Sequence, residues 1–448
     1  MEKLFKLQAH GTSIKTEIIA GLTTFFTMAY IIFVNPTILG AGYDSPAAMP
    51  DLAVVTATCI AAAIGTWLIG WLTNYPLAQA PGMGLNAVFA YTLCGAMGLS
   101  YAAALSAVFI AGLFFILLTV TGARKAIVNA IPLSLKKAIS AGIGFFIALV
   151  GFNNAGLLSS ETGTIIGMGS LAVPTTLLAL FGLILTIVLV IVKCPGALFV
   201  SIVGTSVVGC ILQFGFGLPM GVSWIPTLDF SVFGSAFTGF GELFSAPIAS
   251  LIAVMITLVL VDMFDTIGTL IGAANKAGYL DENGNLPKVE RAMLADAIAT
   301  SAGAIVGTST VTTYVESTAG ISAGGKTGLT STVTGICFAL ALFLSPVLGF
   351  VPSAATAPVL IVVGIMMAGA LKDVDWHDMS IAIPSFLTVI CMPLFYSITD
   401  GLAFGFISFV VVKLASRKAK EIHPLMYIIV ALFLIKYILS ALTALGII

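Results

Sequence analysis

The chain has 448 residues, of which 59% are hydrophobic and only 8% are charged, and its formal net charge is −1. A soluble domain carries roughly 25% charged residues because it needs a hydrated surface, so this composition excludes an ordinary soluble protein. The near-neutral charge and the absence of a basic block exclude a nucleic-acid partner. The six cysteines contain no CxxC pair, which argues against a disulfide or metal framework.

Apolar segments long enough to cross a membrane follow one another from residue 18 to the C-terminus. A helix needs about 20 residues to cross the hydrocarbon core. In chain order, the predicted spans are 18–39, 52–73, 79–97, 101–121, 137–155, 174–192, 195–217, 245–275, 289–307, 308–325, 328–350, 354–371, 379–397 and 399–416. A further apolar stretch, 424–448, is either a fifteenth crossing or a helix lying against the bundle. We therefore expect an all-α integral membrane protein with fourteen transmembrane segments.

The basic residues sort to one side of these predicted spans. If the N-terminal segment 1–17 is cytoplasmic, every lysine and arginine except Lys436 falls in an inside loop or tail, whereas the outside loops carry only acids. One missed or invented span would scramble this sorting. The pattern therefore supports fourteen crossings and predicts a cytoplasmic N-terminus.

Fourteen spans suggest two halves of seven, because transporters often contain inverted repeats. We place the first seven-span repeat at 18–217 and the second at 245–416, with 424–448 as an extra C-terminal segment. Spans five and twelve share a spacing, with Pro132, Gly144 and Ala148 in one and Pro352, Gly364 and Ala368 in the other. Two tight hairpins are also expected, at Pro195-Gly196 and at Asp400-Gly401. Since seven is odd, the second half must enter the membrane in the opposite orientation.

Spans three and ten both begin with sequences that form helices poorly. Residues 80–86 are rich in glycine and proline, and residues 307–314 are rich in threonine and valine. A partly extended span leaves backbone N–H and C=O groups without partners at mid-membrane, which is tolerated only where protein or substrate satisfies them. Paired interrupted segments in two halves therefore indicate the binding site.

Three acids fall inside the apolar spans, namely Asp262 and Asp265 in span eight and Glu316 in span ten. An unpaired carboxylate in hydrocarbon costs at least about 2.5 kcal/mol, so each should face the protein interior, where burial favours its neutral, protonated form. The spacing of three places Asp262 and Asp265 on one helical face. An alternative role for these acids is to cap the broken helices. Asp296, near the inner end of span nine, is interpreted as an interfacial charge.

Two other functional patterns are rejected. Residues 320–327 match the phosphate-loop pattern GxxxxGK[ST], but their flanks are membrane spans and no nucleotide-binding domain surrounds them. Glycines for close helix packing explain this run better. The sequence has no HExxH, and the three histidines lie in cytoplasmic segments, so a membrane zinc protease is not expected. An aspartyl protease would need two facing acids, which Asp265 and Glu316 could mimic, but the paired interrupted spans argue against it.

Four segments together resemble the second nucleobase–cation symporter family, in its AzgA-like purine permease branch. They are residues 21–30, 80–87, 262–268 and 312–317, and the resemblance runs nearly end to end. It implies fourteen spans in two inverted halves, divided into a core domain and a gate domain. It also implies that short strands in spans three and ten flank the bound base.

The resemblance implies roles for individual residues. Glu316 would hydrogen-bond the base, and Asp265 matches the span-eight acid that contacts the base in uracil permease-like relatives. Asp262 matches a further acid typical of the purine branch, and Asn86 matches a polar position on span three. Ser317 follows Glu316 where uracil and xanthine relatives carry asparagine, which favours the purine branch.

The same segments add Gly84, Thr313 and Phe264 to the expected substrate contacts. We therefore expect a proton-coupled importer of purine bases in the plasma membrane, with Asp262 or Asp265 as proton carrier and no cofactor besides the proton. Its partners would be the purine base, membrane lipid and a second copy in a homodimer. The alternatives are an anion transporter of the sulfate or bicarbonate type, which the acidic site disfavours, and a membrane-embedded enzyme.

Overall fold

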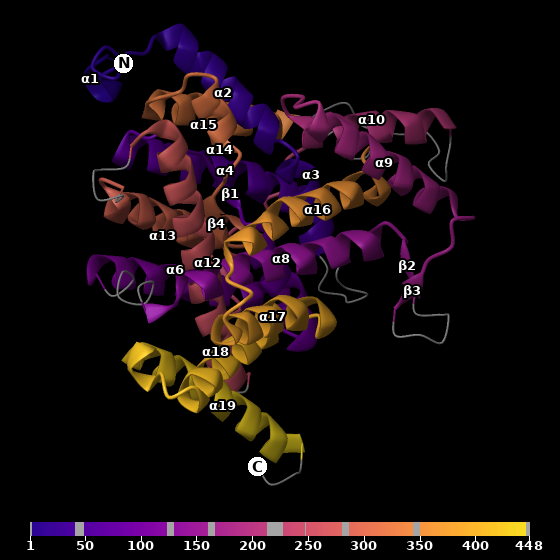
Figure 1. Cartoon of the computed structure of the whole chain (residues 1–448). Coiled ribbons are helices and arrows are strands. Elements are labelled where there is room, and N and C mark those ends of the chain that lie inside the picture. The colour runs from indigo at the N-terminus through magenta and orange to yellow at the C-terminus, as the bar shows by residue number, and fades with distance from the viewer. Residues whose placement is uncertain are drawn as a thin grey trace.

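The computed structural model describes residues 2–40, 49–122, 130–159, 166–212, 227–246, 248–279, 286–343 and 350–444. Helices dominate this part of the chain, and its strands are short (Figure 1). The first half contains α1 (Glu2–Phe5), α2 (Ile14–Met28), α3 (Ile31–Gly40), α4 (Asp51–Thr73), β1 (Gln79–Pro81), α5 (Met83–Ala87), the π-helix η1 (Val88–Ala96), α6 (Tyr101–Val120), α8 (Leu133–Asn154), β2 (Leu158–Ser159), β3 (Gly167–Met168), α9 (Pro174–Ile191) and α10 (Ala197–Leu212).

The second half contains η2 (Ser235–Phe237), α11 (Phe240–Leu243), α12 (Ile248–Ala277), α13 (Val289–Val306), β4 (Val311–Thr313), α14 (Ser317–Ser322), α15 (Gly328–Ala341), α16 (Ser353–Ala368), η4 (Gly369–Asp373), α17 (Met379–Leu394), α18 (Ile398–Ala415), η5 (Ala419–Glu421) and α19 (Pro424–Ala444). Seven helical stretches of the described chain are long and apolar enough to cross a membrane. Several others are shorter, including those of spans three and ten, where a strand replaces part of the helix.

Helix contacts repeat between the two halves of the chain. The contact of α4 with α15 corresponds to the contact of α13 with α6. In the same way, the contact of α17 with α8 corresponds to that of α9 with α16. The hairpins α9–α10 and α17–α18 also correspond. If every span of the first seven is exchanged with the equivalent span of the second seven, each contact becomes the other contact of its pair. The fold is therefore the predicted inverted repeat of seven and seven spans.

These contacts define two packed groups of helices. We call α2 to α6 together with α12 to α15 the core group, and α8, α9, α10, α16, α17 and α18 the gate group. Both groups contain elements from both halves, which confirms the expected core and gate division. The limits predicted for the repeats remain a prediction, because residues 213–226, where the first one ends, lie outside the described residues.

The shared spacing in spans five and twelve marks the centre of the gate group. Pro132 and Pro352 are the N-cap residues of α8 and α16. Gly144 of α8 faces Gly364 of α16, and a Cβ atom on Gly144 would lie 2.8 Å from the Gly364 carbonyl oxygen. The two glycines therefore allow the equivalent helices of the two repeats to approach at backbone distance.

Two local features differ from the sequence-based expectation. Span one is interrupted, because α2 ends at Met28 and α3 begins at Ile31. The α17–α18 turn lies before Ile398, so the turn predicted at Asp400-Gly401 is wrong, and these two residues belong to the first turn of α18. The Ser397 side chain caps that helix by accepting from the Asp400 amide, which ends the turn earlier than the glycine suggested.

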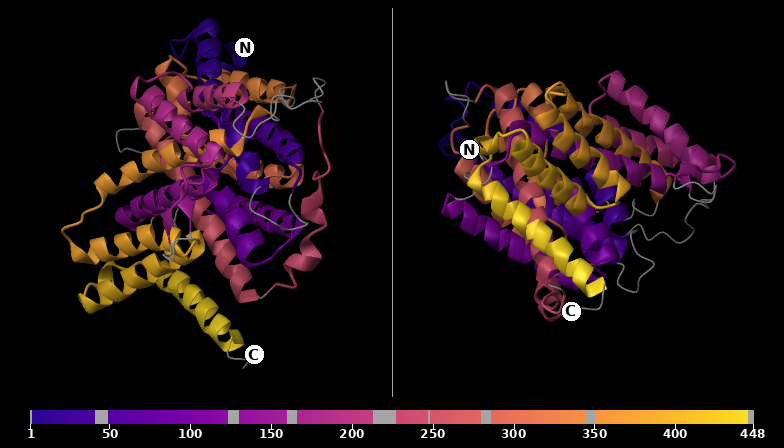
Figure 2. Two further views of the ribbon diagram at one scale, coloured as in Figure 1. Left: turned by 90° about the vertical axis from the view of Figure 1, so that its right-hand side faces the viewer. Right: turned by 60° about the horizontal axis from the view of Figure 1, so that its bottom comes forward.

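The extra helix α19 packs on α12 and α18 at the edge of the bundle (Figure 2). Glu421, just before α19, pairs with Lys413 near the end of α18 at 2.6 Å. Lys436, further along α19, pairs with Asp400 at the start of α18, also at 2.6 Å. α19 therefore runs back along α18, and the fifteenth crossing remains a prediction. It also gives Lys436, the exception to the charge sorting, an acidic partner.

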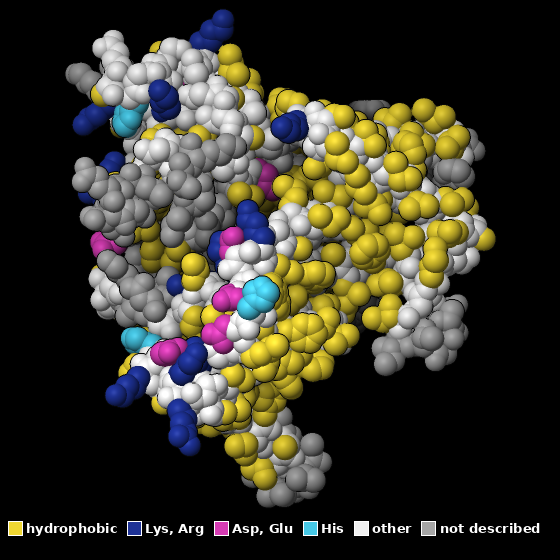
Figure 3. Space-filling model, in the orientation of Figure 1, with side chains coloured by type: hydrophobic (Ala, Val, Ile, Leu, Met, Phe, Trp, Pro, Cys, Tyr) yellow, Lys and Arg dark blue, Asp and Glu magenta, His cyan; other side chains and the backbone are white. Residues whose placement is uncertain are grey.

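The molecular surface separates by polarity. Hydrophobic side chains cover the face over α8, α9, α10 and α16, whereas Lys, Arg, Asp, Glu and His gather toward the left of the view in Figure 3. Ile191 of α9 and Ile211 of α10 are each 72% exposed. Large exposed apolar residues on every outward side of long helices are typical of a lipid-facing surface.

Candidate functional site

Spans three and ten meet in a two-stranded antiparallel sheet inside the core group. β1 pairs with β4, with Gln79 opposite Thr313 and Pro81 opposite Val311. The pairing continues on both sides, since the Tyr314 amide donates to the Ala78 carbonyl at 3.0 Å. The short strands expected in spans three and ten are therefore confirmed.

Neighbouring helices satisfy the backbone at the start of each strand in the same way. The Thr66 hydroxyl of α4 donates to the Gln79 carbonyl at 2.9 Å and accepts from the Gln79 amide at 3.0 Å. The Thr300 hydroxyl of α13 donates to the Val311 carbonyl at 3.1 Å and accepts from the Val311 amide at 3.3 Å. Extended backbone at this depth needs such partners, and the two repeats supply them by equivalent threonines.

Glu316 lies directly after β4, at the N-cap position of α14. Its side chain makes no capping hydrogen bond to that helix, so the capping alternative is wrong for this acid. Its Oε1 accepts instead from the Tyr30 hydroxyl at 2.7 Å. Tyr30 is fully buried in the break between α2 and α3, so the interruption of span one delivers a donor to the acid of span ten.

α12 packs beside β4 and carries the two acids of span eight. Asp265 is partly buried, and its Oδ2 lies 3.4 Å from the Thr312 hydroxyl of β4, within hydrogen-bond distance. Asp265 also lies within electrostatic reach of Glu316 and of Asp296. Asp262 is fully buried one helical turn earlier on α12. The structure therefore brings Glu316 and Asp265 together around β4.

Thr312 and Thr313 point to opposite faces of β4, as successive strand residues do. Thr312 faces Asp265, whereas the Thr313 hydroxyl accepts from the Gln79 side-chain amide at 3.2 Å. Thr313, predicted as a substrate contact, therefore faces a polar layer behind the sheet. Its proposed contact with the base remains a prediction.

Asp296 is the centre of that polar layer. It is fully buried on α13, so its interpretation as an interfacial charge is wrong. Its Oδ1 accepts from the Thr266 hydroxyl at 2.8 Å, and the Gln79 amide nitrogen lies 3.4 Å away. Thr266 follows Asp265 in α12, and Gln79 belongs to β1. Asp296 therefore connects α12 to β1.

Asn86 of α5 belongs to a buried amide network. Its Nδ2 donates to Asn35 Oδ1 at 2.6 Å, and its Oδ1 accepts from the Ser309 hydroxyl. Asn35 of α3 donates in turn to Thr58 at 2.6 Å. Both polar atoms of Asn86 are therefore engaged by the protein, and its contact with the base remains a prediction.

The remaining predicted residues lie around this centre. Gly84 packs against α8 of the gate group, where an added Cβ would lie 2.8 Å from Ile143 Cγ2. The Ser317 hydroxyl accepts from the Ala78 amide at 3.0 Å and so holds the start of β1. The side chain of Phe264 lies outside the described residues.

The run of residues 320–327 has the structural role expected of its glycines. An added Cβ on Gly325 would lie 2.9 Å from the Ala20 side chain of α2, so the α14–α15 turn rests directly on this helix. The carboxylate of Glu17, fully buried on α2, accepts from the Lys326 amide at 2.9 Å and from the Thr330 hydroxyl at 2.6 Å. A protein carboxylate therefore satisfies donors of this turn and of the start of α15.

The arrangement suits a planar polar ligand. Two carboxyl groups, a tyrosine hydroxyl and threonine hydroxyls offer donors and acceptors around one short strand. Within the described residues, no group of three or more His, Cys, Asp or Glu side chains could hold a metal ion. Sequence reasoning missed Thr312 and Gln79 as site residues. It allowed Tyr30, in the aromatic run of span one, only to stack on a flat ring or to pack, and did not predict that its hydroxyl reaches Glu316.

Several known proteins are similar to this chain over nearly its full length. Residues 15–404 match a family model described as a permease family, Xan_ur_permease. The guanine/hypoxanthine permease PbuO of Bacillus subtilis is 43% identical over 440 residues, which cover 97% of this chain and 99% of that protein. The adenine permease AdeQ of Escherichia coli is 41% identical over 439 residues, covering 98% and 96%.

Solved structures of low sequence identity share the fold. The transmembrane domain of the cyanobacterial bicarbonate transporter BicA superposes with a TM-score of 0.63 at 17% identity, covering 87% of this chain and 96% of that one. The structure of SLC26A9 gives a TM-score of 0.62 at 13% identity, covering 90% and 66%. At these identities the likeness shows the architecture alone.

Proposed function

Because the chain belongs to the permease family that residues 15–404 match, and is therefore a transporter and not an enzyme, we propose that it imports purine nucleobases together with protons. The observation that carries this proposal is the pair of carboxyl groups, Glu316 and Asp265, held around β4 inside the core group. The names of relatives 41–43% identical over nearly the full chain support a purine substrate, with hypoxanthine and guanine or adenine as candidates.

The chemistry of a purine fits these groups. Its edge alternates N–H donors with nitrogen and carbonyl acceptors, so carboxyl groups and hydroxyls in one plane can hydrogen-bond to it. A site that pairs with particular base groups rejects analogues that would leave its buried polar atoms unpaired. Glu316 would anchor the base, with its carboxylate oriented by the Tyr30 hydroxyl.

Proton coupling follows from the cost of charge at this depth. A charged carboxylate in a membrane-spanning segment is expensive, so binding a proton there is favourable. Asp265 or the deeper Asp262 would take up the proton from the outer side and release it inside. The base and proton would cross together as the core group moves against the gate group, because such sites lie between the moving parts of transporters. Gly84 lies at that boundary, against Ile143.

Uptake into proteoliposomes tests the substrate class and the anchor. Radiolabelled adenine, guanine, hypoxanthine and uracil would be offered with and without an inward proton gradient to wild type, Glu316→Gln and Glu290→Gln. Glu290 is exposed in the first turn of α13, so its variant makes the same chemical change outside the site. We expect gradient-stimulated purine uptake that only Glu316→Gln abolishes. Uptake indifferent to Glu316 would contradict the proposal.

Anion transport, the alternative raised by the sequence, is not favoured. The likeness to bicarbonate and SLC26 transporters shows the fold alone, and a site built from carboxyl groups repels anions. The proposal includes a plasma-membrane location, a cytoplasmic N-terminus supported by the sorting of basic residues, and a homodimer.

A further inference from the structure

A cavity of about 520 Å³ lies away from the purine site, where the start of α8 meets α17, α18 and the start of α19. Its polar lining includes Ser134, Lys413, Lys420, Glu421 and His423. The proposed transport mechanism uses none of these residues. They lie at the end of the gate group that the basic residues of the sequence predict to face the cytoplasm.

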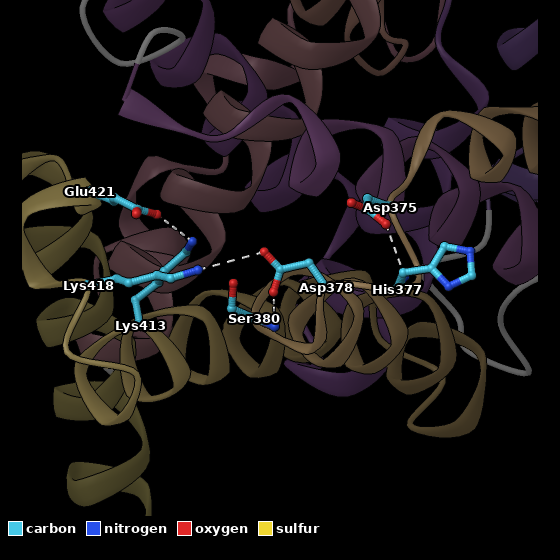
Figure 4. A network of polar contacts seen from close by, with 7 residues as sticks. All are labelled: Asp375, His377, Asp378, Ser380, Lys413, Lys418 and Glu421. Carbon is cyan, nitrogen blue, oxygen red and sulfur yellow. Dashed lines mark hydrogen bonds and ion pairs between the residues drawn. The ribbon is translucent and has the colours of Figure 1, made fainter.

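The charges of this cavity favour an anion. The Lys413 side chain is only 7% exposed, and its Nζ lies 2.6 Å from Glu421 Oε2. This hydrogen bond holds the pKa of Glu421 below its usual range, so the glutamate stays charged and balances Lys413. Figure 4 shows that the neighbouring Lys418 is directed to Asp378, at 3.9 Å. Lys420 is exposed and leaves the lining with a net positive charge.

Two further groups with donor atoms border the same space. Among the described residues, α8 begins after Pro132 with no side-chain cap, and the positive end of its dipole lies at the cavity. The Nδ1 atom of His423 accepts from the Leu425 amide at 3.3 Å. In the neutral ring the proton therefore sits on Nε2, which makes this nitrogen a donor.

The rest of the lining is apolar. Ile381, Phe409 and Ile422 line the cavity between α17, α18 and the start of α19. A small soluble anion gains nothing from such walls, whereas a phosphate attached to a glycerol and acyl chains can bury part of its apolar body against them. Basic pockets between transmembrane helices on the cytoplasmic side are typical sites for anionic lipid headgroups.

We propose that this cavity binds the phosphate-bearing headgroup of an anionic phospholipid from the inner leaflet. Lys420, His423 and the start of α8 hold the phosphate, and the apolar wall receives the glycerol region. The occupant links α8, α18 and α19, which come from both repeats and from the extra helix. The lipid thereby fastens α19 to the gate group.

Native mass spectrometry of the purified, delipidated full chain tests this site. The protein would be offered phosphatidylglycerol against phosphatidylcholine, as wild type, as Lys420→Gln/His423→Gln, and as the control His10→Gln/Lys15→Gln. All four substituted side chains are exposed, and the control makes the same two changes in the N-terminal segment. Removal of one positive charge near a phosphate weakens binding about five-fold. We therefore expect at least this loss of phosphatidylglycerol for the cavity variant and none for the control.

Two results would overturn the proposal. Equal retention of phosphatidylglycerol by the cavity variant and the control would show that the lipid binds elsewhere. Displacement of the lipid by inorganic phosphate at equal concentration would show that a soluble anion, and not a lipid, is the natural occupant. Failure of phosphate to compete, together with the loss in the cavity variant, is the outcome that the apolar wall predicts.

Discussion

The hydrogen bond between Tyr30 and Glu316 offers a sharp test of the binding site. Tyr30→Phe removes one oxygen atom and leaves the ring, which is fully buried in the break of span one. The lost bond is 2.7 Å long and reaches a carboxyl group in a low-dielectric interior. If Tyr30 orients Glu316 toward the base, its loss should weaken binding without unfolding the protein.

The size of the effect follows from the kind of bond. Hydrogen bonds to charged groups contribute about 1.5–3 kcal/mol, which corresponds to about a 10- to 150-fold change in an equilibrium constant. We therefore expect the KM for purine uptake to rise by at least about ten-fold, because Glu316 would otherwise be positioned by the base alone. Initial rates of radiolabelled purine uptake over a range of concentrations measure this change.

A matched control separates this effect from general damage. Tyr101 is also buried, and its hydroxyl donates to the Gly307 carbonyl at 2.9 Å, away from the acids. Tyr101→Phe should lower stability modestly and leave KM unchanged. An unchanged or lower KM for Tyr30→Phe would refute the reasoning, since it would mean that Tyr30 does not position Glu316 or even competes with the base.

Three further predictions concern packing and buried polar groups. Gly364→Ala should destabilise the protein by about 1–3 kcal/mol, because the new Cβ would overlap the α8 backbone. Gly369 has open space around it, so Gly369→Ala should not destabilise the protein, and thermal unfolding compares the two variants. Glu17→Gln should lower the free energy of unfolding by about 1–3 kcal/mol, because the new side-chain amide would present donors to the backbone amides and hydroxyls at the start of α15. A melting temperature equal to that of Glu290→Gln would contradict this role. Asp296→Asn should reduce purine uptake through the displaced Gln79 and Thr266 contacts, and uptake equal to wild type would show that the layer behind the sheet is dispensable.

Local sequence predicted those parts of the fold that depend on hydrophobic length and helix breaking. The spans, the two strands and the repeated Pro–Gly spacing all follow from such patterns, and Gly144 and Gly364 do meet at the repeat interface. The break in span one was not predicted, because residues 29–30 carry no glycine or proline to interrupt an apolar run.

Side-chain direction was harder to predict than element type. Asp296 looked interfacial because it is not far along the chain from Lys288 and Arg291, yet α13 places it fully inside the core group. Thr312 and Thr313 are indistinguishable by sequence, and only the register of β4 decides which one faces Asp265. Such contacts depend on tertiary packing between the two repeats, to which a single sequence gives no direct access.

The most direct test of proton-coupled purine import records proton and base movement together. Proteoliposomes containing a pH-sensitive dye would receive hypoxanthine, guanine or adenine without an imposed gradient, and the internal pH would be followed beside radiolabel uptake. The proposed mechanism predicts internal acidification that begins with purine addition, scales with uptake and disappears in Glu316→Gln but not in Glu290→Gln. Purine uptake without any change of internal pH would contradict proton coupling and the role assigned to the acids of α12.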